Sequence, residues 1–229
     1  MAGRYPTAER VVVKVGTGTL FDEAPEAVSG YKFLGDQLQA LCYEISGMSR
    51  EIAVVSSGAI ATAACEFGAP VPKSKYEKAQ LAGRGQHILM GRYETFLREY
   101  GKGCAQCLLT HDDLKDARRR RNLRMVLDGY FRDGIVPIIN ENDTVSTEEI
   151  SFGDNDKLAA SLAFPACLDA DLVVMLSNRV EGLGTGGGAS KEEARRMLEQ
   201  AGISMEIING RYERDGDAWK PKIWQLFLP

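Results

Sequence analysis

An apolar run of β-branched residues, 135–139, constrains the fold of this chain more than any other feature. Gly134 precedes the run and a polar cluster, residues 140–143, follows it, so the pattern predicts a buried strand with carboxylates and amides at its C-terminal end. Open parallel sheets bind ligands at that end of their strands. A second polar cluster, residues 153–156, opens an expected helix, where Asp154 or Asn155 can act as cap and exposed N–H groups favour an anion. Either cluster alone could be an ordinary turn or cap, but together they predict one shared site.

Further apolar runs alternate with helical stripes along the chain. Strands are expected at residues 10–15, 51–55, 104–109, 134–139 and 171–176, with two short ones at 206–208 and 223–228. Helices are expected at residues 78–100, where Gly83 and Gly85 mark close packing, and at 119–132. This βα alternation predicts an α/β fold: a single three-layer αβα sandwich with a mainly parallel central sheet.

Lys14 interrupts the first expected strand near its end. An unpaired amine inside the protein would be costly, so Lys14 is expected to point into a polar site. The alternative is an edge strand from which the lysine reaches water.

Composition limits the possible partners. With 229 residues, 44% of them hydrophobic, the chain is expected to form one domain over residues 1–229. A net charge of −4 argues against a nucleic-acid partner, and the basic run at 118–121 is expected on a solvated helix face. No run approaches the ~18 apolar residues of a membrane span, and no signal peptide is visible, so we expect a cytoplasmic protein without a membrane partner. The five cysteines fit reduced thiols, and Cys104 with Cys107 is expected in a strand rather than in a redox or zinc site.

A glycine-rich stretch, residues 182–188, follows the strand expected at 171–176 and precedes Lys191. Flexible glycines let backbone N–H groups converge on phosphate oxygens, while a helix N-terminus and a lysine add positive charge. The stretch also contains Gly182-x-Gly184-x-x-Gly187 with Glu206 further on, which leaves an NAD-dependent oxidoreductase as a rival interpretation. That fingerprint alone is weak, and here it follows the last long strand instead of the first. A plain glycine-rich surface loop is the third alternative.

Five motifs, in order along almost the whole chain, resemble those of the glutamate 5-kinases, a family of the amino acid kinase superfamily. They are Val13-Lys14-Val15-Gly16-Thr17, Ser56-Ser57-Gly58-Ala59-Ile60, Val136-Pro137-Ile138-Ile139-Asn140-Glu141-Asn142-Asp143, Gly153-Asp154-Asn155-Asp156, and Gly184-Thr185-Gly186-Gly187 with Lys191. The resemblance implies the amino acid kinase fold and ATP-dependent phosphorylation of the L-glutamate γ-carboxylate, the first step of proline biosynthesis. It further implies Mg²⁺ as a cofactor beside ATP, a homo-oligomer, and proline as a feedback inhibitor.

The resemblance also assigns roles to residues. Lys14 and Lys191 would be catalytic and clamp the transferred phosphoryl group, with Asp156 holding both lysines in place. Glutamate would be bound by Ser57, Asn140, Asp143 and Asn155. The nucleotide would be bound by Lys14, Ser177, Asn178, Gly184, Thr185, Gly186, Gly187 and Lys191. No residue is assigned as a metal ligand.

The chain departs from the family pattern in several places. Ser177-Asn178 stands where bacterial relatives have Thr-Asp, and Gly188-Ala189-Ser190 replaces Met-Ser-Thr, so a non-catalytic binding module on the same fold is a further alternative. Because few residues follow the strand expected at 206–208, no C-terminal RNA-binding-like domain is expected. The segment between the strand ending at Leu176 and the glycine-rich stretch is too short for the hairpin that covers the nucleotide. We favour residues missing from the sequence between Asn178 and Arg179; if none are missing, ATP should bind poorly.

Overall fold

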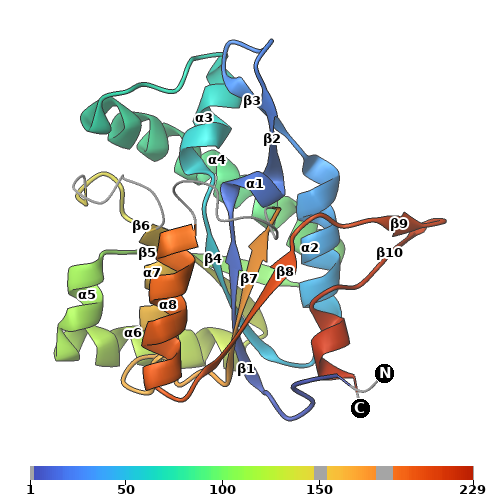
Figure 1. The fold of residues 1–229 in the computed structure, drawn as a ribbon, viewed down its shortest axis with the longest axis vertical. Coiled ribbons are helices and arrows are strands. Elements are labelled where there is room, and N and C mark those ends of the chain that lie inside the picture. Colours follow the sequence, from blue (N-terminus) through green and yellow to red (C-terminus); the bar gives the residue numbers. More distant parts are fainter. Residues whose placement is uncertain (1–2, 147–153, 179–187, 229) are drawn as a thin grey trace.

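The apolar runs pair into one six-stranded sheet with the order β5-β6-β4-β1-β7-β8. This computed structural model describes residues 3–146, 154–178 and 188–228 (Figure 1). Every pairing in the sheet is parallel. The strands are β1 (Arg10–Val15), β4 (Glu51–Ser56), β5 (Gly103–Leu109), β6 (Ile135–Glu141), β7 (Leu172–Ser177) and β8 (Ser204–Asn209). All carboxyl ends therefore meet at one edge, as the sequence predicted.

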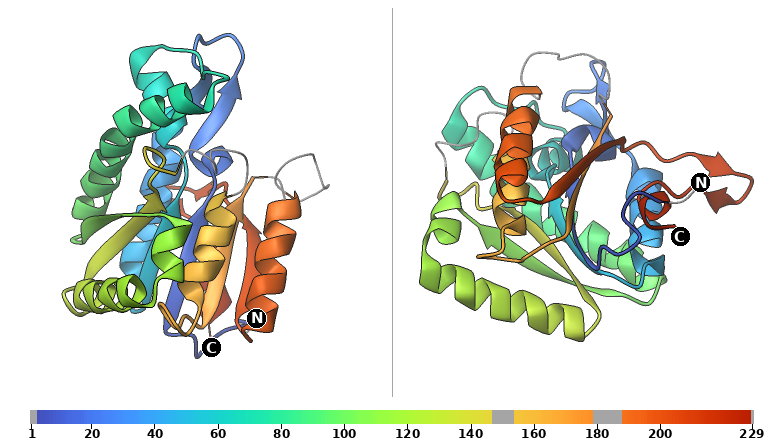
Figure 2. Two further views of the ribbon diagram at one scale, coloured as in Figure 1. Left: turned by 90° about the vertical axis from the view of Figure 1, so that its left-hand side faces the viewer. Right: turned by 60° about the horizontal axis from the view of Figure 1, so that its bottom comes forward.

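The two faces of the sheet are covered by different helices (Figure 2). Side chains alternate along a strand, so Val11 and Val13 of β1 pack into one core and Val12 into the other. The first core contains residues of α2 (Gly35–Gly47) and α4 (Lys75–Glu99). The second contains residues of α6 (Ala117–Arg132), α7 (Asp154–Ala163) and α8 (Gly188–Gln200). The expected three-layer sandwich is confirmed.

Close packing between α3 (Ala59–Phe67) and α4 depends on Gly85. A Cβ atom there would lie 2.0 Å from the carbonyl oxygen of Ala59, so any side chain would push the helices apart. Gly83, two residues earlier in the same helix, would bring a Cβ within 3.1 Å of Thr144 in the loop after β6. The expectation that both glycines mark close approaches is confirmed: α4 lies against α3 at Gly85 and against the loop after β6 at Gly83.

Smaller elements complete the fold. A hairpin of β2 and β3 follows the short helix α1 and runs alongside α3, as Figure 1 shows. The bounds of α1, the hairpin strands and the remaining short elements are α1 (Thr17–Leu20), β2 (Phe21–Ala24), β3 (Gly30–Phe33), α5 (His111–Lys115), β9 (Arg214–Asp215) and β10 (Ala218–Trp219). None of the helices that the structure describes is long and apolar enough to cross a membrane.

The expectation of a strand at residues 223–228 is wrong, because this segment contains a 3-10 helix, Trp224–Phe227. Its position is set by Glu44 of α2, whose buried carboxylate accepts hydrogen bonds from the backbone N–H of Lys222 at 2.6 Å and of Trp224 at 2.7 Å. The Tyr212 hydroxyl donates to the same carboxylate at 2.6 Å. These N–H groups are therefore not available for a sheet.

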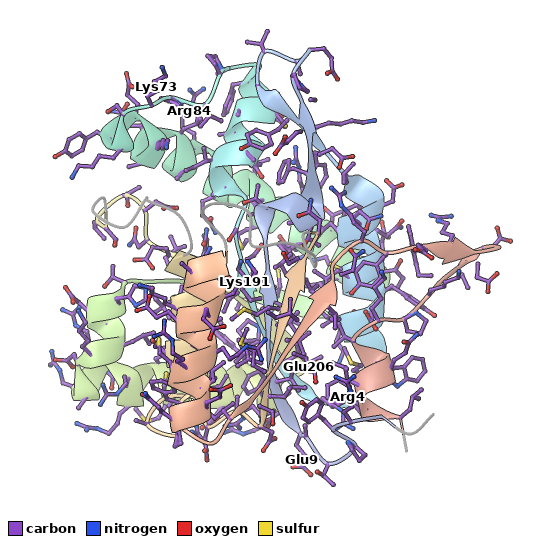
Figure 3. The ribbon with its side chains drawn as sticks, in the orientation of Figure 1. Arg4, Glu9, Lys73, Arg84, Lys191 and Glu206 are labelled. Carbon is purple, nitrogen blue, oxygen red and sulfur yellow. The ribbon has the colours of Figure 1, made fainter. Side chains whose placement is uncertain are left out.

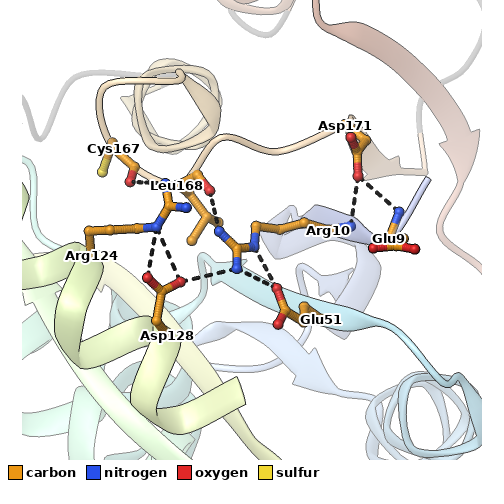
Figure 4. A network of polar contacts seen from close by, with 8 residues as sticks. All are labelled: Glu9, Arg10, Glu51, Arg124, Asp128, Cys167, Leu168 and Asp171. Carbon is orange, nitrogen blue, oxygen red and sulfur yellow. Dashed lines mark hydrogen bonds and ion pairs between the residues drawn. The ribbon is translucent and has the colours of Figure 1, made fainter. Parts of the chain in front are cut away.

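The amino end of β1 is anchored far from the ligand edge by the guanidinium of Arg10 (Figure 4). Arg10 bonds Glu51 at 2.6 Å through Nε, the carbonyl oxygen of Leu168 at 2.8 Å through Nη1, and Asp128 at 3.0 Å through Nη2. Asp171 accepts the backbone N–H of Arg10 at 2.9 Å. This network connects β1 to α6 and to both neighbouring strands, so the strand that carries Lys14 is held at both of its ends.

Candidate active site

Lys14 lies in the central strand of the sheet, not at an edge. Its strand pairs with β4 on one side and β7 on the other, which excludes the alternative of a lysine that reaches water from an edge strand. Lys14 is in phase with Val12, so its side chain is directed to the face covered by α7 and α8. Only 7% of the residue is exposed, and its Nζ lies 2.5 Å from Oδ1 of Asp156.

Asp156 connects this strand to two helices. It is the third residue of α7 and is 1% exposed. Its Oδ2 lies 3.4 Å from Nζ of Lys191 and accepts a hydrogen bond of 3.1 Å from the hydroxyl of Ser190, both in α8. Lys191 extends from α8 toward the sheet in Figure 3. The structure thus brings Lys14, Lys191 and Asp156 together.

Electrostatics in this cluster favour an incoming anion. Burial lowers the pKa of the Lys14 ammonium below its usual value; Asp156 opposes the shift, and the nearby Lys191 adds to it. Two lysines and one aspartate leave a net positive charge when all three are ionised. An anion close to Nζ would restore favourable interactions that Lys14 loses by burial.

Amide side chains form a second cluster beside the lysines. Nδ2 of Asn155 donates to the Ser57 hydroxyl oxygen at 2.8 Å and to Oδ1 of Asn140 at 2.9 Å. Nδ2 of Asn140 donates to Oε1 of Gln86 at 2.8 Å. Ser57 follows β4, Asn140 belongs to β6, and Asn155 opens α7, so three segments distant in sequence meet at the carboxyl edge of the sheet. Of the residues expected to bind glutamate, the structure brings Ser57, Asn140 and Asn155 together.

Asn155 and Asp156 join the two clusters because they are consecutive. Successive side chains on a helix diverge by about 100°. Asn155 therefore contacts the amide cluster while Asp156 contacts the lysines, although their Cα atoms are only ~3.8 Å apart. One turn of α7 therefore contacts both the positively charged lysine pair and the amide cluster.

The remaining expected glutamate residue, Asp143, lies in the turn that follows β6. Asn142 begins this turn by donating its backbone N–H to the carbonyl oxygen of Leu109 at 2.8 Å, and its own carbonyl accepts from the N–H of Val145 at 3.0 Å. Asp143 is partly exposed at the carboxyl edge. Its turn is thus tied to β5 next to the strand that carries Asn140.

The nucleotide side is only partly described. Ser177 ends β7, and its carbonyl oxygen accepts the N–H of Gly210 at 3.1 Å. Asn178 lies against Gly18, where an added Cβ would fall 2.5 Å from the Asn178 Oδ1. The expected phosphate-binding residues Gly184, Thr185, Gly186 and Gly187, and the join between Asn178 and Arg179, lie outside the described residues.

Glu206 does not have the surroundings of a ribose-binding carboxylate. It accepts hydrogen bonds from Arg4 Nη1 at 3.0 Å and from the Tyr5 hydroxyl at 2.9 Å. Figure 3 places Glu206 beside Arg4, well away from Lys191. The second half of the dinucleotide fingerprint is therefore a contact with the N-terminal segment.

The cysteine pair and the basic run both lie where they were expected. Cys104 and Cys107 lie in β5 as expected and face opposite cores. In the basic run of α6, Arg118, Arg119 and Arg121 are exposed, which confirms the solvated face.

Two residues that contact the site were missed by the sequence interpretation, Gln86 and Ser190. Gln86 occupies the inner stripe of α4 with Leu89 and Tyr93, where an apolar residue is the rule, so its polarity was an available signal.

Comparisons with known proteins agree with this geometry. Residues 9–209 match the model of the amino acid kinase family. Isopentenyl phosphate kinase from T. acidophilum has the same fold, with a TM-score of 0.58 at 17% identity over 88% of this chain and 91% of that one. Giardia carbamate kinase has a TM-score of 0.56 at 12% identity, covering 89% and 94%. The chain belongs to the amino acid kinase family.

Curated relatives show which branch of the amino acid kinase family the chain is similar to. Glutamate 5-kinase of Symbiobacterium thermophilum is 35% identical over 92% of this chain and 91% of its own length. Glutamate 5-kinase of Myxococcus xanthus is 42% identical over 88% of this chain but only 52% of its own length, and that of Caldanaerobacter subterraneus 34% over 96% and 68%. Within the family the chain is therefore of the glutamate 5-kinase type.

Proposed function

We propose that this chain transfers the γ-phosphoryl group of ATP to the γ-carboxylate of L-glutamate, forming glutamate 5-phosphate and ADP, the first step of proline biosynthesis. One observation carries the proposal: Asp156 gathers two lysines immediately beside an amide cluster on the same turn of α7. The similarity to glutamate 5-kinases supports the choice of substrate.

The reaction needs charge neutralisation more than proton transfer. A γ-carboxylate oxygen of glutamate forms a bond to the γ-phosphorus, the bond from that phosphorus to the β–γ bridging oxygen breaks, and ADP leaves with the electron pair. The attacking carboxylate is already ionised at pH 7, so no general base is required. Two anions must approach each other, which positioned cations make possible.

Lys14 and Lys191 supply those cations. Their ammonium groups contact the transferred phosphoryl oxygens, where negative charge grows toward the transition state. Asp156 keeps both groups in place and opposes the lowering of the Lys14 pKa by burial. Ser177, Asn178 and the glycines 184, 186 and 187 with Thr185 bind the rest of the nucleotide.

Glutamate lies against the amide cluster. Ser57, Asn140 and Asn155 bind its polar groups, and Asp143 pairs with its α-ammonium. The turn that carries Asp143 is anchored to β5, so the carboxylate is presented at a defined distance from Asn140.

Magnesium enters as part of the nucleotide complex. Among the described residues, no three His, Cys, Asp or Glu side chains are grouped as metal ligands, and Asp156 is engaged by the lysines. Mg²⁺ is commonly held by phosphate oxygens, waters and at most one or two carboxylates, so MgATP fits such a site. When bound, the ion reduces the charge of the phosphates.

Further parts of the proposal rest on the family resemblance. They are one kinase domain over residues 1–229, a homo-oligomer, and inhibition by proline at the glutamate pocket. A cytoplasmic location is supported by five free cysteines, which fit a reducing compartment. The alignment with the Caldanaerobacter relative spans 261 positions, more than the 229 residues of this chain, so that relative has residues that this chain lacks. Such a difference is compatible with both alternatives for the nucleotide lid, residues missing from the sequence between Asn178 and Arg179, which we favour, or a true lack of the lid with weak ATP binding.

Glutamate-dependent release of ADP tests the proposal. Purified protein is incubated with MgATP and each of a panel of amino acids, and ADP is measured by a coupled assay. ADP release with glutamate, and not with aspartate or glutamine, is expected. Binding of glutamate without turnover would instead favour the non-catalytic binding module, and ADP release independent of the amino acid would exclude glutamate as the specific acceptor.

A further inference from the structure

We propose that Gln86 is a positioning residue: together with the backbone N–H of Glu141 it holds the amide of Asn140 and thereby fixes which atom of Asn155 is presented to the substrate. Gln86 belongs to α4 and reaches the site only through Asn140. The inference rests on the proposed function, because it concerns recognition of the amino acid substrate. It adds a residue outside the five motifs that define the family resemblance.

The argument begins at the backbone N–H of Glu141, which can only donate. It donates to Oδ1 of Asn140 at 2.9 Å, so this atom must be the amide oxygen. Nδ2 of Asn140 must then face Gln86, and the Gln86 atom that it contacts at 2.8 Å must be an acceptor, Oε1. The orientation of both amides follows from one backbone group.

The same logic continues to Asn155. Oδ1 of Asn140 accepts from Asn155, so the donor atom is Nδ2, whose two hydrogens are used by Asn140 and Ser57. Oδ1 of Asn155 is therefore directed elsewhere as a pure acceptor, and it is buried without a partner among the described residues. Ser57 accepts one of these bonds, which leaves its own hydroxyl hydrogen to donate. A buried acceptor beside a free donor fits the ammonium and the carboxylate of an amino acid.

Gln86 is held in this orientation at a cost to itself. The residue is 7% exposed, and its Nε2 is buried without a partner among the described residues. Such an unsatisfied donor is unfavourable, so the Gln86 amide keeps this orientation because its Oε1 accepts the hydrogen bond from Asn140. The tight packing at Gly83 and Gly85 brings this part of α4 against the loop after β6, which follows Asn140, and against α3, which follows Ser57.

Two substitutions separate positioning from plain stability. Gln86→Met removes the unsatisfied Nε2 but leaves Asn140 Nδ2 without an acceptor, so the gain and the loss offset each other and the melting temperature should change little. The amide of Asn140 is then no longer held from both sides. The KM for glutamate should rise about tenfold, as expected for one lost hydrogen bond to a charged group, with kcat little changed.

Gln86→Glu should have the opposite profile. A carboxylate oxygen still accepts from Asn140, so the KM should stay within about threefold of the unmutated value, while burial of an added charge lowers the melting temperature. Gln39→Met is the matched control, because Gln39 of α2 bonds only Glu99 among the described side chains, at the C-terminal end of α4. Gln86→Asn, one methylene shorter, replaces Gln86→Met if that variant does not fold.

The measurements are the KM and kcat for glutamate, the preference for glutamate over glutarate, which lacks the ammonium, and the melting temperature. A raised KM and a weakened preference in stable Gln86→Met, with both retained in less stable Gln86→Glu, support the inference. A KM that follows the melting temperature across the variants overturns it, as does an unchanged KM in Gln86→Met. If the unmutated chain does not phosphorylate glutamate, the proposed function itself fails, and the inference falls with it.

Discussion

Replacing Asp156 by Asn should make stability and activity depend on pH in opposite directions. The carboxylate contacts Nζ of Lys14 at 2.5 Å and Nζ of Lys191 at 3.4 Å, and all three side chains are largely buried. Breaking a buried ion pair by removing one partner typically costs about 3–5 kcal/mol. Asparagine has nearly the same shape, so the effect isolates the charge.

The pH dependence follows from Lys14. Burial already lowers its pKa, and without Asp156 the pKa falls further, because the main opposing interaction is lost. Burying an unpaired ammonium cannot destabilise the fold by more than the free energy of deprotonating the lysine, because the group can lose its proton instead. That free energy is about 1.4 kcal/mol for each pH unit below the pKa of about 10.4 in an unfolded chain. That limit is about 4.6 kcal/mol at pH 7 and about 1.9 kcal/mol at pH 9. Because the unfolded chain binds more protons in this range, the variant should gain stability relative to the unmutated protein as pH rises.

Activity should show the reverse trend. A neutral Lys14 no longer stabilises the phosphoryl oxygens, so kcat of the variant should be lower by at least about 10²-fold and should decrease further as pH rises. Urea denaturation of both proteins at pH 7, 8 and 9, with kcat at the same values, provides the data. A stability difference that is constant from pH 7 to 9, or a kcat profile parallel to that of the unmutated protein, would refute the reasoning.

Other substitutions test separate parts of the site and the fold. Lys14→Met and Lys191→Met should each lower kcat about 10²–10³-fold with little change in the KM for glutamate, because they act on transition-state charge; equal losses seen only in KM would contradict this. Asp143→Ala should mainly raise the KM for glutamate, and equal use of glutarate by the unmutated protein would exclude pairing with the ammonium. Burial raises the pKa of Glu44, so the unmutated chain should lose stability relative to Glu44→Gln as pH increases above about 4.5, measured by urea denaturation from pH 4 to 8; a constant difference would contradict it.

The strands and their edge were predictable because they depend on local patterns. The apolar runs at 10–15 and 135–139 form strands in the structure, and the polar residues that follow them meet as expected. Parallel pairing brings all carboxyl ends together whatever the strand order is. A correct assignment of strands was therefore enough to locate the site.

Elements that depend on distant contacts were not predictable. The run at residues 223–228 is apolar at all but one position, like a buried strand, but Glu44, far away in sequence, takes the N–H groups of Lys222 and Trp224 that a sheet would need. The hairpin of β2 and β3 was missed because Asp22 and Glu23 interrupt its first strand. Gln86 was missed because a glutamine in a long helix has no local signal of function; only its place in an apolar stripe distinguishes it.

The spacing of motifs in the sequence also does not show how the lysine cluster and the amide cluster are connected. The motifs at residues 140–143 and 153–156 suggest two polar groups in one site, but they do not say which residue serves which ligand. The helical geometry of α7 decides this, since Asn155 and Asp156 diverge by about 100° and contact different neighbours. Because the two residues share one turn, the distance between the recognition groups and the lysines is set by the backbone and not by flexible side chains. A reaction between two anions benefits from such an arrangement, since positioning and charge neutralisation then depend on the same rigid element.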